Sequence, residues 1–370
     1  MIDRRLFFHI NWGLLVLVAM LFVVGAINLY SASTLRGSEG LELDVYFNKQ
    51  LLWGGASLCA MTLVVIFDYR HFQAIAWPLF LLSFALLLGV ALAGKSISGA
   101  KRWLDLGFFH FQPTELAKIA VLILTARILS RIEGRLGWIN LGKTVLIGLI
   151  PAIIIIKQPD LGSALNIMLI LGGMVLFKGL TPAVFRTLLV CIPITLPFGW
   201  FFLHDYQKKR ILTFLDPGND PLGAGYHIIQ SQIAIGSGGF WGKGFLEGTQ
   251  SQLRFLPEKH TDFAFAVLGE EWGFFGSILL LVLFCSFLYQ IYVVSLEAKD
   301  DFGRYLVAGV FFYFFWQILI NMGMVLGIMP VVGIPLPFIS YGGSASVINF
   351  CMIGLVLNIA MRRFMFKKSG

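Results

Sequence analysis

One short stretch of the sequence carries an unusual density of ionisable side chains. Glu258, Lys259, His260 and Asp262 lie within it, immediately before the apolar Phe263. Carboxylates beside an imidazole can transfer protons as general acids or bases, although an acid at a helix start often serves only as a cap. Four ionisable groups are more than a cap needs, so we interpret the stretch as a candidate catalytic site.

The same residues do not match a familiar metal or hydrolase site. Their spacing fits no standard zinc or calcium loop, and no Gly-x-Ser-x-Gly elbow occurs in a strand-turn-helix setting. Metal ligands are therefore left unassigned. The glycine-rich run 236–244 lacks the context of a nucleotide-binding fingerprint and is interpreted as a flexible turn.

Two further polar clusters stand at the borders of apolar segments. Glu115 and Lys118 are three residues apart, which places them on one helical face. A helix that starts at Pro113 would favour Glu115 in its first turn but would not need Lys118. Asp160 follows Gln-Pro in a turn and could cap the next helix or belong to a site, and both interpretations stay open.

The composition explains what surrounds these clusters. Of the 370 residues, 58% are hydrophobic and 13% are charged, about half the charge of an average soluble chain. We therefore predict an all-α polytopic membrane protein that forms a single domain over residues 1–370. The net charge of +8 comes from residues scattered through short loops, so no nucleic-acid partner is expected.

Ten apolar segments are long enough to predict membrane-spanning helices. The seventh and eighth are separated by a segment of residues 204–273, which we expect to lie outside the membrane, to contain interfacial helices (226–234 is a candidate) and to carry function. With ten spans, both termini lie on the side of the membrane opposite to this segment. Lys and Arg are much more frequent in the termini and loops of that side than in the short loops on the side of the segment, so both termini are expected in the cytoplasm. The predicted spans are 11–30, 51–67, 72–94, 115–132, 141–157, 161–178, 183–203, 274–295, 303–328 and 344–361.

Taken in order, the polar clusters resemble the shape, elongation, division and sporulation family of cell-wall polymerases, and the resemblance covers nearly the whole chain. Each motif is weak alone, but the ordered set is specific. Residues 248–253 resemble the rod-shape branch rather than the division branch. The motifs are Lys101-Arg102-Trp103, Gln112–Lys118, Gln158–Gly162, Asp216–Tyr226, Gly236–Gly239, Leu256–Phe263, Gly269–Gly273 and Pro335–Ser344.

The resemblance implies a peptidoglycan glycosyltransferase in the bacterial plasma membrane that polymerises lipid II at the outer leaflet during cell elongation. It implies that Asp262 is the catalytic residue. It also implies a class B penicillin-binding protein transpeptidase and other elongation-machinery proteins as partners. A divalent cation, Mg²⁺ or Mn²⁺, is associated with such activity, and no organic cofactor is expected.

The chemistry of the residues agrees with that expectation. Inverting transfer to a sugar hydroxyl needs one carboxylate as general base, and a diphosphate leaving group needs neutralising cations rather than an acid. We expect Asp262 to be the base, with Arg102, Lys118 and Arg210 facing the diphosphate. Glu115 could hold Lys118 or a metal ion, while Asp160, Glu258 and His260 would complete the substrate site.

Two other functions stay open on sequence alone. A flippase for the lipid-linked precursor would use the same spans and buried charges, but its charges should line a cavity open to both sides. Here the charged clusters lie toward the outer face, which favours chemistry at that face. A scaffold without activity would leave Asp262 unexplained.

Overall fold

Each of the ten apolar segments predicted from the sequence is helical in the computed structural model. The model describes residues 10–37, 40–43, 45–97, 100–105, 107, 110–220, 223–253, 255–256 and 258–363. The ten helices are α1 (Trp12–Ser33), α2 (Val45–Ile66), α4 (Ala76–Ala93), α5 (Pro113–Leu129), α6 (Trp138–Lys157), α7 (Leu161–Lys178), α8 (Pro182–Phe202), α12 (Ala264–Leu296), α13 (Asp301–Val325) and α14 (Gly343–Arg362).

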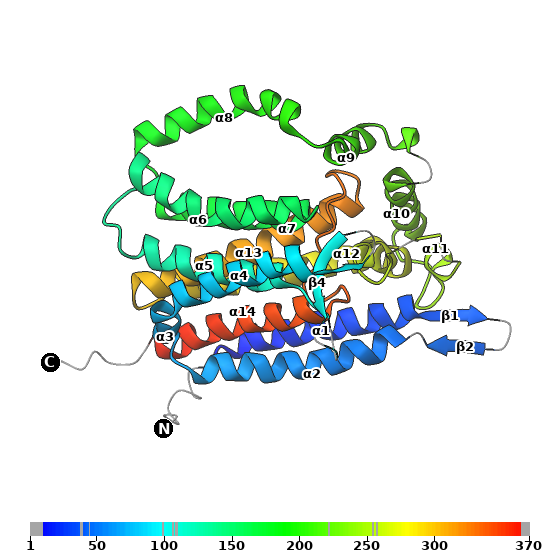
Figure 1. The fold of residues 1–370 in the computed structure, drawn as a ribbon. Helices are drawn as coiled ribbons and strands as arrows, with labels where there is room; N and C mark the ends of the chain where they lie inside the picture. The colour runs from blue at the N-terminus through cyan, green and yellow to red at the C-terminus, as the bar shows by residue number, and fades with distance from the viewer. Residues whose placement is uncertain are drawn as a thin grey trace.

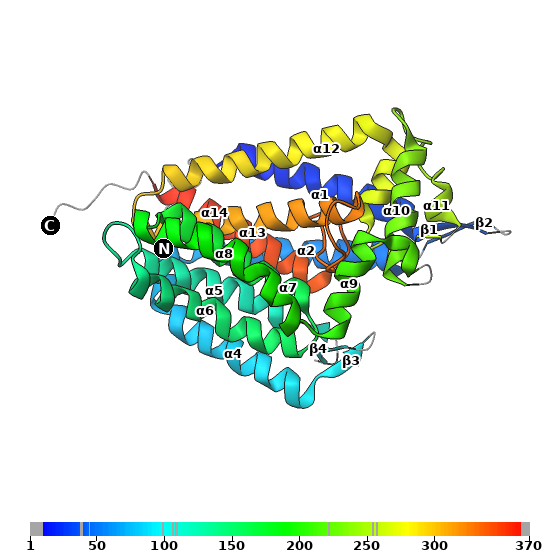
Figure 2. The same cartoon turned by 90° about the horizontal axis from the view of Figure 1, so that it is seen from above.

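These helices form a multi-pass bundle (Figure 1). Seven helices in the described part of the chain are long and apolar enough to cross a membrane, and α4 and α8 add shorter apolar stretches. Helices α5, α13 and α14 are the most buried, and α13 and α14 run through the middle of the bundle (Figure 2). Short helix α3 (Tyr69–Ala74) follows α2.

The long segment between α8 and α12 folds into helices, as predicted. It contains α9 (Asp205–Leu215), a 3₁₀ turn η2 (Pro217–Asn219), α10 (Ala224–Gly238) and α11 (Thr249–Gln252). The expected interfacial helix 226–234 is the middle of α10. These elements lie together at one end of the bundle, opposite α3 and the C-terminal end of α14 (Figure 1).

Short β-hairpins at the same end of the bundle were not predicted. Strands β1 (Thr34–Gly37) and β2 (Gly40–Leu43) pair antiparallel, and β3 (Lys95–Ile97), β4 (Ala100–Asp105) and β5 (His110–Phe111) form a second small sheet. An all-α description therefore holds for the membrane bundle but not for these connections. The second sheet matters for the site because it carries Arg102.

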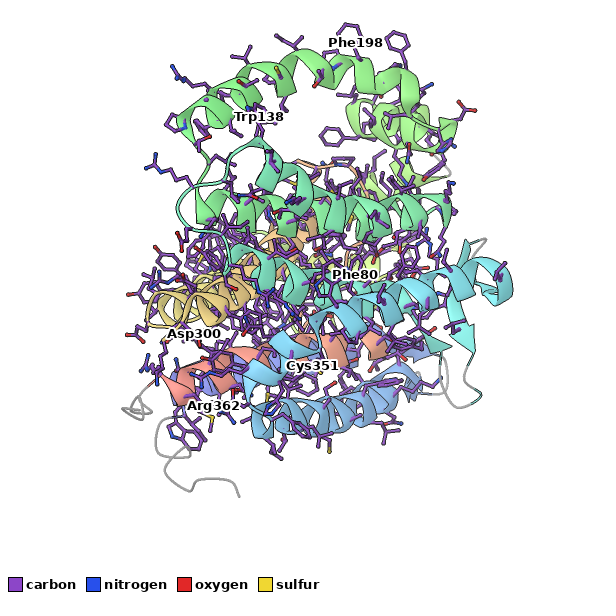
Figure 3. The ribbon with its side chains drawn as sticks, turned by 60° about the vertical axis from the view of Figure 1, so that its left-hand side comes forward. Phe80, Trp138, Phe198, Asp300, Cys351 and Arg362 are labelled. Atoms are coloured by element: carbon purple, nitrogen blue, oxygen red, sulfur yellow. The ribbon has the colours of Figure 1, made fainter. Side chains whose placement is uncertain are left out.

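At the end of the bundle away from these hairpins, polar side chains of α14 bond to neighbouring segments. Asn358 is fully buried, and its amide donates to the carbonyl of Val64 at 2.7 Å. Arg362 lies 3.6 Å from the carboxylate of Asp68, and Figure 3 shows it near Asp300 at this end. The ends of α2, α13 and α14 are thus tied together away from the site.

Helix α8 departs from the bundle. It arches away from α6 and α7 (Figure 1), and most of its apolar side chains are exposed, among them Phe198 (Figure 3). Pro193 and Pro197 lie inside it, and each removes a helical hydrogen bond and favours a bend. The arch of α8 therefore presents an apolar surface that leads to α9, the next helix of the chain.

The first turns of α12 are separated from its spanning part by a kink at Gly273, where φ is +64°. The glycine run docks against this kink through its backbone. Lys243 N donates to Glu270 O at 3.0 Å, and Phe274 N donates to Gly239 O at 2.9 Å. Gly239, Gly242 and Gly244 also have positive φ, so the glycines serve close backbone packing, the conformation that their lack of a side chain permits.

Gly273→Ala should lower the free energy of unfolding by about 2 kcal/mol or more. An added Cβ would lie 2.3 Å from Gly242 N, and the positive φ would be strained. The matched control is Gly89→Ala in α4, where an added Cβ meets no atom within 4 Å. Thermal unfolding of the detergent-solubilised protein measures both, and equal midpoints for the two variants would contradict the role of the kink.

Candidate active site

Asp262 lies in a turn immediately before α12. The turn is closed by Thr261 N, which donates to Glu258 O at 3.1 Å. Asn321 of α13 donates its amide to the backbone oxygens of both Asp262 (2.9 Å) and Ile334 (2.8 Å). The Asp262 carboxylate faces Gly333, where an added Cβ would be 3.4 Å from Oδ2. The acid is therefore held between the outer segment and the connection from α13 to α14.

His260 fixes the same turn to a second part of that connection. Its backbone oxygen accepts from Tyr341 N at 2.8 Å. Its ring stacks on Tyr46 at the start of α2, with centroids 4.8 Å apart. His260 thus shapes the turn that presents Asp262, and its part in substrate binding stays a prediction.

The cations of the site come from elements far apart in the sequence. Arg102 on β4 donates to the carbonyl of Pro159, and its guanidinium is 3.8 Å from the Asp160 carboxylate. Asp160 also caps α7 by accepting from Ser163 N at 3.2 Å. Asp160 therefore caps a helix, as one interpretation of the sequence predicted, and it also orients Arg102. Its part in a substrate site stays a prediction.

Arg210 reaches the site from α9, on the outer segment. Its guanidinium donates to Val331 O at 3.2 Å, in the connection that also touches Asp262. Burial lowers the pKa of Arg210, and the like charge of Arg102 lowers it further, whereas the Asp160 and Asp262 carboxylates raise it. The two guanidinium groups therefore share one electrostatic environment with both carboxylates.

Burial also raises the pKa of Asp262 to about 6. The Glu258 carboxylate adds to this rise, the positive charges of Arg210 and Arg102 oppose it, and Asp160 contributes a smaller rise. These five residues form the charged cluster of the site. Their convergence from β4, the α6–α7 turn, α9 and the Asp262 turn is the main result of the fold for function.

Glu115 and Lys118 are paired, as their spacing predicted, but deeper in the bundle. Lys118 Nζ is 2.6 Å from Glu115 Oε1, and both side chains are buried. The ammonium also lies 6.0 Å from the centre of the Tyr313 ring on α13. Tyr313 in turn donates to Asn349 Oδ1 of α14 at 2.7 Å. The pair joins α5 to the central helices, and its part in substrate binding stays a prediction.

Two contributors to the site were missed by sequence reasoning. Asn321 positions the backbone of Asp262, and Gly333 allows the carboxylate to approach the connection from α13 to α14. Asn321 is not ionisable, so it does not belong to the charged clusters that mark the site in the sequence. A search for any polar residue inside an apolar span would have found Asn321, because such residues are costly unless they are bonded.

The described residues do not form a metal site by themselves. Among them, no group of three or more His, Cys, Asp or Glu is placed to hold an ion. Mg²⁺ commonly takes one or two protein carboxylates together with substrate phosphates. The carboxylates of Glu258 and Asp262 fit that arrangement if a diphosphate supplies the remaining ligands.

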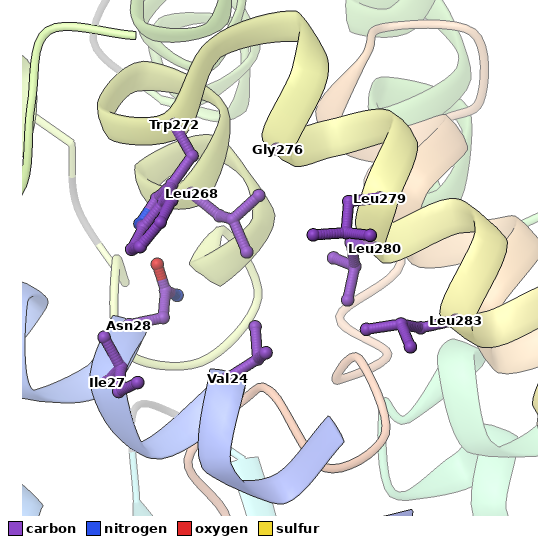
Figure 4. A pocket seen from close by; sticks show the side chains of 9 residues that line it. All are labelled: Val24, Ile27, Asn28, Leu268, Trp272, Gly276, Leu279, Leu280 and Leu283. Carbon is purple, nitrogen blue, oxygen red and sulfur yellow. The ribbon is translucent and has the colours of Figure 1, made fainter. Parts of the chain in front are cut away.

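An apolar hollow lies beside the first turn of α12. It is lined from α1 and from both sides of the Gly273 kink (Figure 4). The Asn28 amide donates to Ala264 O at 2.9 Å and so ties the hollow to the residue two places after Asp262. The lining residues are Val24, Ile27, Asn28, Leu268, Trp272, Gly276, Leu279, Leu280 and Leu283.

The fold and the site together define a class of protein. It is a helical multi-pass membrane protein with a carboxylate and guanidinium groups gathered at one end of the bundle. The family model for FtsW, RodA and SpoVE, described as cell cycle protein, matches residues 12–364. The chain belongs to this family, as the resemblance predicted.

Curated relatives match along almost the full chain. The peptidoglycan glycosyltransferase MrdB of Escherichia coli K12 is 42% identical over 355 residues, which is 95% of each chain. A probable peptidoglycan glycosyltransferase FtsW of Geobacter metallireducens is 37% identical over 357 residues, 94% of each chain.

Solved structures agree with the fold. A chain of a peptidoglycan synthase complex, from a structure on the coordination of polymerization and crosslinking, aligns with a TM-score of 0.82 at 31% identity. It covers 96% of this chain and 99% of that one. The rod shape determining protein RodA of Thermus thermophilus aligns at 0.71 and 30% identity, covering 96% and 98%.

Lys118→Met should cost about 3–5 kcal/mol of stability, because it leaves the Glu115 carboxylate buried without its cation. The double variant Glu115→Gln with Lys118→Met should regain most of that loss, since neither buried side chain then carries a charge. Thermal unfolding of the single and double variants tests the pair. A double variant less stable than Lys118→Met would contradict it.

Proposed function

We propose that the chain is a peptidoglycan glycosyltransferase that polymerises lipid II, with Asp262 as the general base. The observation that carries the proposal is the convergence of Arg102, Asp160, Arg210 and Glu258 on Asp262. A base works best when its pKa is near the working pH, and about 6 meets that condition better than the ordinary value of an aspartate.

The reaction requires one proton transfer and one exchange of bonds at carbon. The acceptor hydroxyl oxygen attacks the anomeric carbon of the donor, whose bond to the diphosphate oxygen breaks with inversion. Asp262 takes the hydroxyl proton as the new glycosidic bond forms. The diphosphate leaves with the electron pair of the broken bond and needs no proton.

Arg102 and Arg210 are placed to neutralise the departing diphosphate. Guanidinium groups suit phosphate oxygens because their planar N–H donors can bind two oxygens at once. Arg102 is held by Asp160 and a backbone carbonyl, so little reorganisation is needed. A divalent cation, if used, would be held by Glu258 or Asp262 together with the diphosphate, and it would add positive charge there.

A lipid-linked substrate suits the apolar surroundings of the site. The hollow between α1 and α12 is lined by Leu268 and Trp272, six and ten residues after Asp262 (Figure 4). A polyprenyl tail lying in it would remain in the membrane while the headgroup meets the acid. The exposed apolar surface of the arched α8 offers a second path from the membrane towards α9, which carries Arg210.

The proposed orientation places the Asp262 end outside the cell and both termini in the cytoplasm of a bacterial plasma membrane. The distribution of Lys and Arg among the loops supports it. The similarity to a chain of a peptidoglycan synthase complex supports a class B penicillin-binding protein transpeptidase as partner, with other elongation-machinery proteins.

Asp262→Asn should abolish polymerisation of lipid II, because the amide has the shape of the carboxylate but cannot accept the proton. The loss should be about a hundredfold or more, within the range for removing a general base. The purified protein with its transpeptidase is given lipid II, and glycan products are separated by gel. Glu247→Gln, which changes an exposed carboxylate of the same outer segment, is the control and should polymerise lipid II at close to the unmodified rate. Polymer formed by Asp262→Asn at the unmodified rate would overturn the proposal.

The rate of polymerisation should rise with pH through about 6 and then level off, since Asp262 accepts a proton only when it is ionised. Arg210 lowers the pKa of Asp262, so Arg210→Met should move this rise to higher pH as well as slow the reaction. Initial rates from pH 4.5 to 8 measure both effects. A flat profile in the unmodified protein would contradict the assigned base.

A further inference from the structure

The buried carboxylate of Glu270 is not used in the mechanism above, yet it is the most heavily bonded acid in the described chain. It is fully buried on the first turns of α12. Its oxygens accept from Lys243 Nζ (2.7 Å) and from the backbone of Gln250 (2.9 Å) and Ser251 (3.2 Å). Thr249 adds a hydroxyl at 3.2 Å.

These bonds place α11 on α12. The amides of Gln250 and Ser251 belong to the first turn of α11, whose donors have no partners within the helix. Glu270 therefore supplies, from a distant part of the chain, the acceptor that a capping side chain would supply locally. Lys243 Nζ lies 2.7 Å from Glu270 Oε1 and balances the charge of the buried carboxylate.

The far side of α11 connects to the catalytic turn. Ser251 O accepts from Lys259 Nζ at 2.7 Å, and the Lys259 side chain is buried. Lys259 lies between Glu258 and His260, three residues before Asp262. The contacts run from Glu270 through the backbone of α11 to Lys259 and so to the turn that carries the acid.

We propose that Glu270 is a positioning residue for Asp262, acting through α11 and Lys259. The inference rests on the proposed role of Asp262 as base. Asn321 and Tyr341 hold the turn from the central bundle, and the contacts through α11 hold it from the outer segment. If only the contacts with Asn321 and Tyr341 remained, the turn that carries Asp262 would stay attached to the bundle but could tilt toward solvent.

Two variants break the contacts at opposite ends. Glu270→Gln keeps the side-chain shape, loses the charge that pairs with Lys243 and replaces one acceptor oxygen with a donor. Lys259→Met keeps the buried length and loses the bond to Ser251 O. Each should lower the kcat of polymerisation about tenfold to a hundredfold, because small displacements of a reacting group cost that much, while KM stays within about twofold.

The double variant separates positioning from general loss of stability. If both residues act through α11, the second change breaks contacts that are already lost. The kcat of the double variant should then lie within about threefold of that of the slower single variant. Asp300→Asn is the control: this acid also accepts from a backbone amide, Gly303 N at 2.8 Å, and from the Tyr69 hydroxyl, but it caps α13 at the opposite end of the bundle. It should keep kcat within about threefold.

Hydrogen exchange measured by mass spectrometry tests the contacts without any activity. Backbone amides between residues 249 and 263 should exchange about tenfold faster or more in Glu270→Gln and in Lys259→Met, but not in Asp300→Asn. Unchanged exchange in folded Glu270→Gln would overturn the inference even if polymerisation is lost. If Glu270→Gln does not fold, Lys259→Met gives the same test.

The outcomes separate this inference from the proposed function. If Asp262→Asn polymerises lipid II at the unmodified rate, the assigned base is wrong whatever the Glu270 variants do. If Asp262→Asn is inactive and Glu270→Gln has unmodified kcat, the base stands and the positioning role is overturned. Rate losses that multiply in the double variant would also overturn it.

Discussion

The backbone pairing between the glycine run and the kinked start of α12 is the contact on which the outer segment depends. A membrane-spanning helix cannot simply change direction where it meets the outer segment, because its backbone groups must stay hydrogen-bonded. The kink at Gly273 interrupts that pattern, and Phe274 N then bonds to Gly239 O. The interruption is possible because another backbone segment supplies the missing partner.

This constraint decides which residues can serve chemistry. Side chains inside the spans must be paired, as Glu115 and Lys118 are. A buried carboxylate that is bonded to a cation on the same helix is held in place, so it suits structure better than a part in the reaction. Asp262 lies just outside the helix, where the fold can bury it enough to raise its pKa and still leave it near two cations that limit the rise. The acid that we propose as the base therefore comes from a turn.

The ten apolar helices and the charged clusters could be predicted from sequence because each depends on local composition. A run of about twenty apolar residues favours a membrane-spanning helix, and Glu and Lys three apart lie on one face of a helix, whatever bundle surrounds them. The convergence of Arg102, Arg210 and Asp262 could not be predicted in this way, because it depends on β4 and α9 meeting in space. The resemblance to a known family supplied the expectation that these clusters belong to one site.

Other features escaped for identifiable reasons. The hairpins are too short for an alternating pattern to be distinguished from loop sequence, so the strand that carries Arg102 was not predicted. The glycine run was interpreted as a flexible turn, whereas its positive φ values and close backbone contacts make it a docking element. Glycine allows both flexibility and close approach, and only the partner segment reveals which is used.

The distribution of bonds around Glu270 and Asp262 follows from their different tasks. Glu270 has four donors and stays where they hold it. Asp262 is held through its backbone oxygen, by Asn321, and its carboxylate faces Gly333 rather than a bulky side chain. Fixing the backbone of a base leaves its oxygens available to a substrate hydroxyl. Fixing the carboxylate itself would require those bonds to break at each turnover, which would add to the barrier.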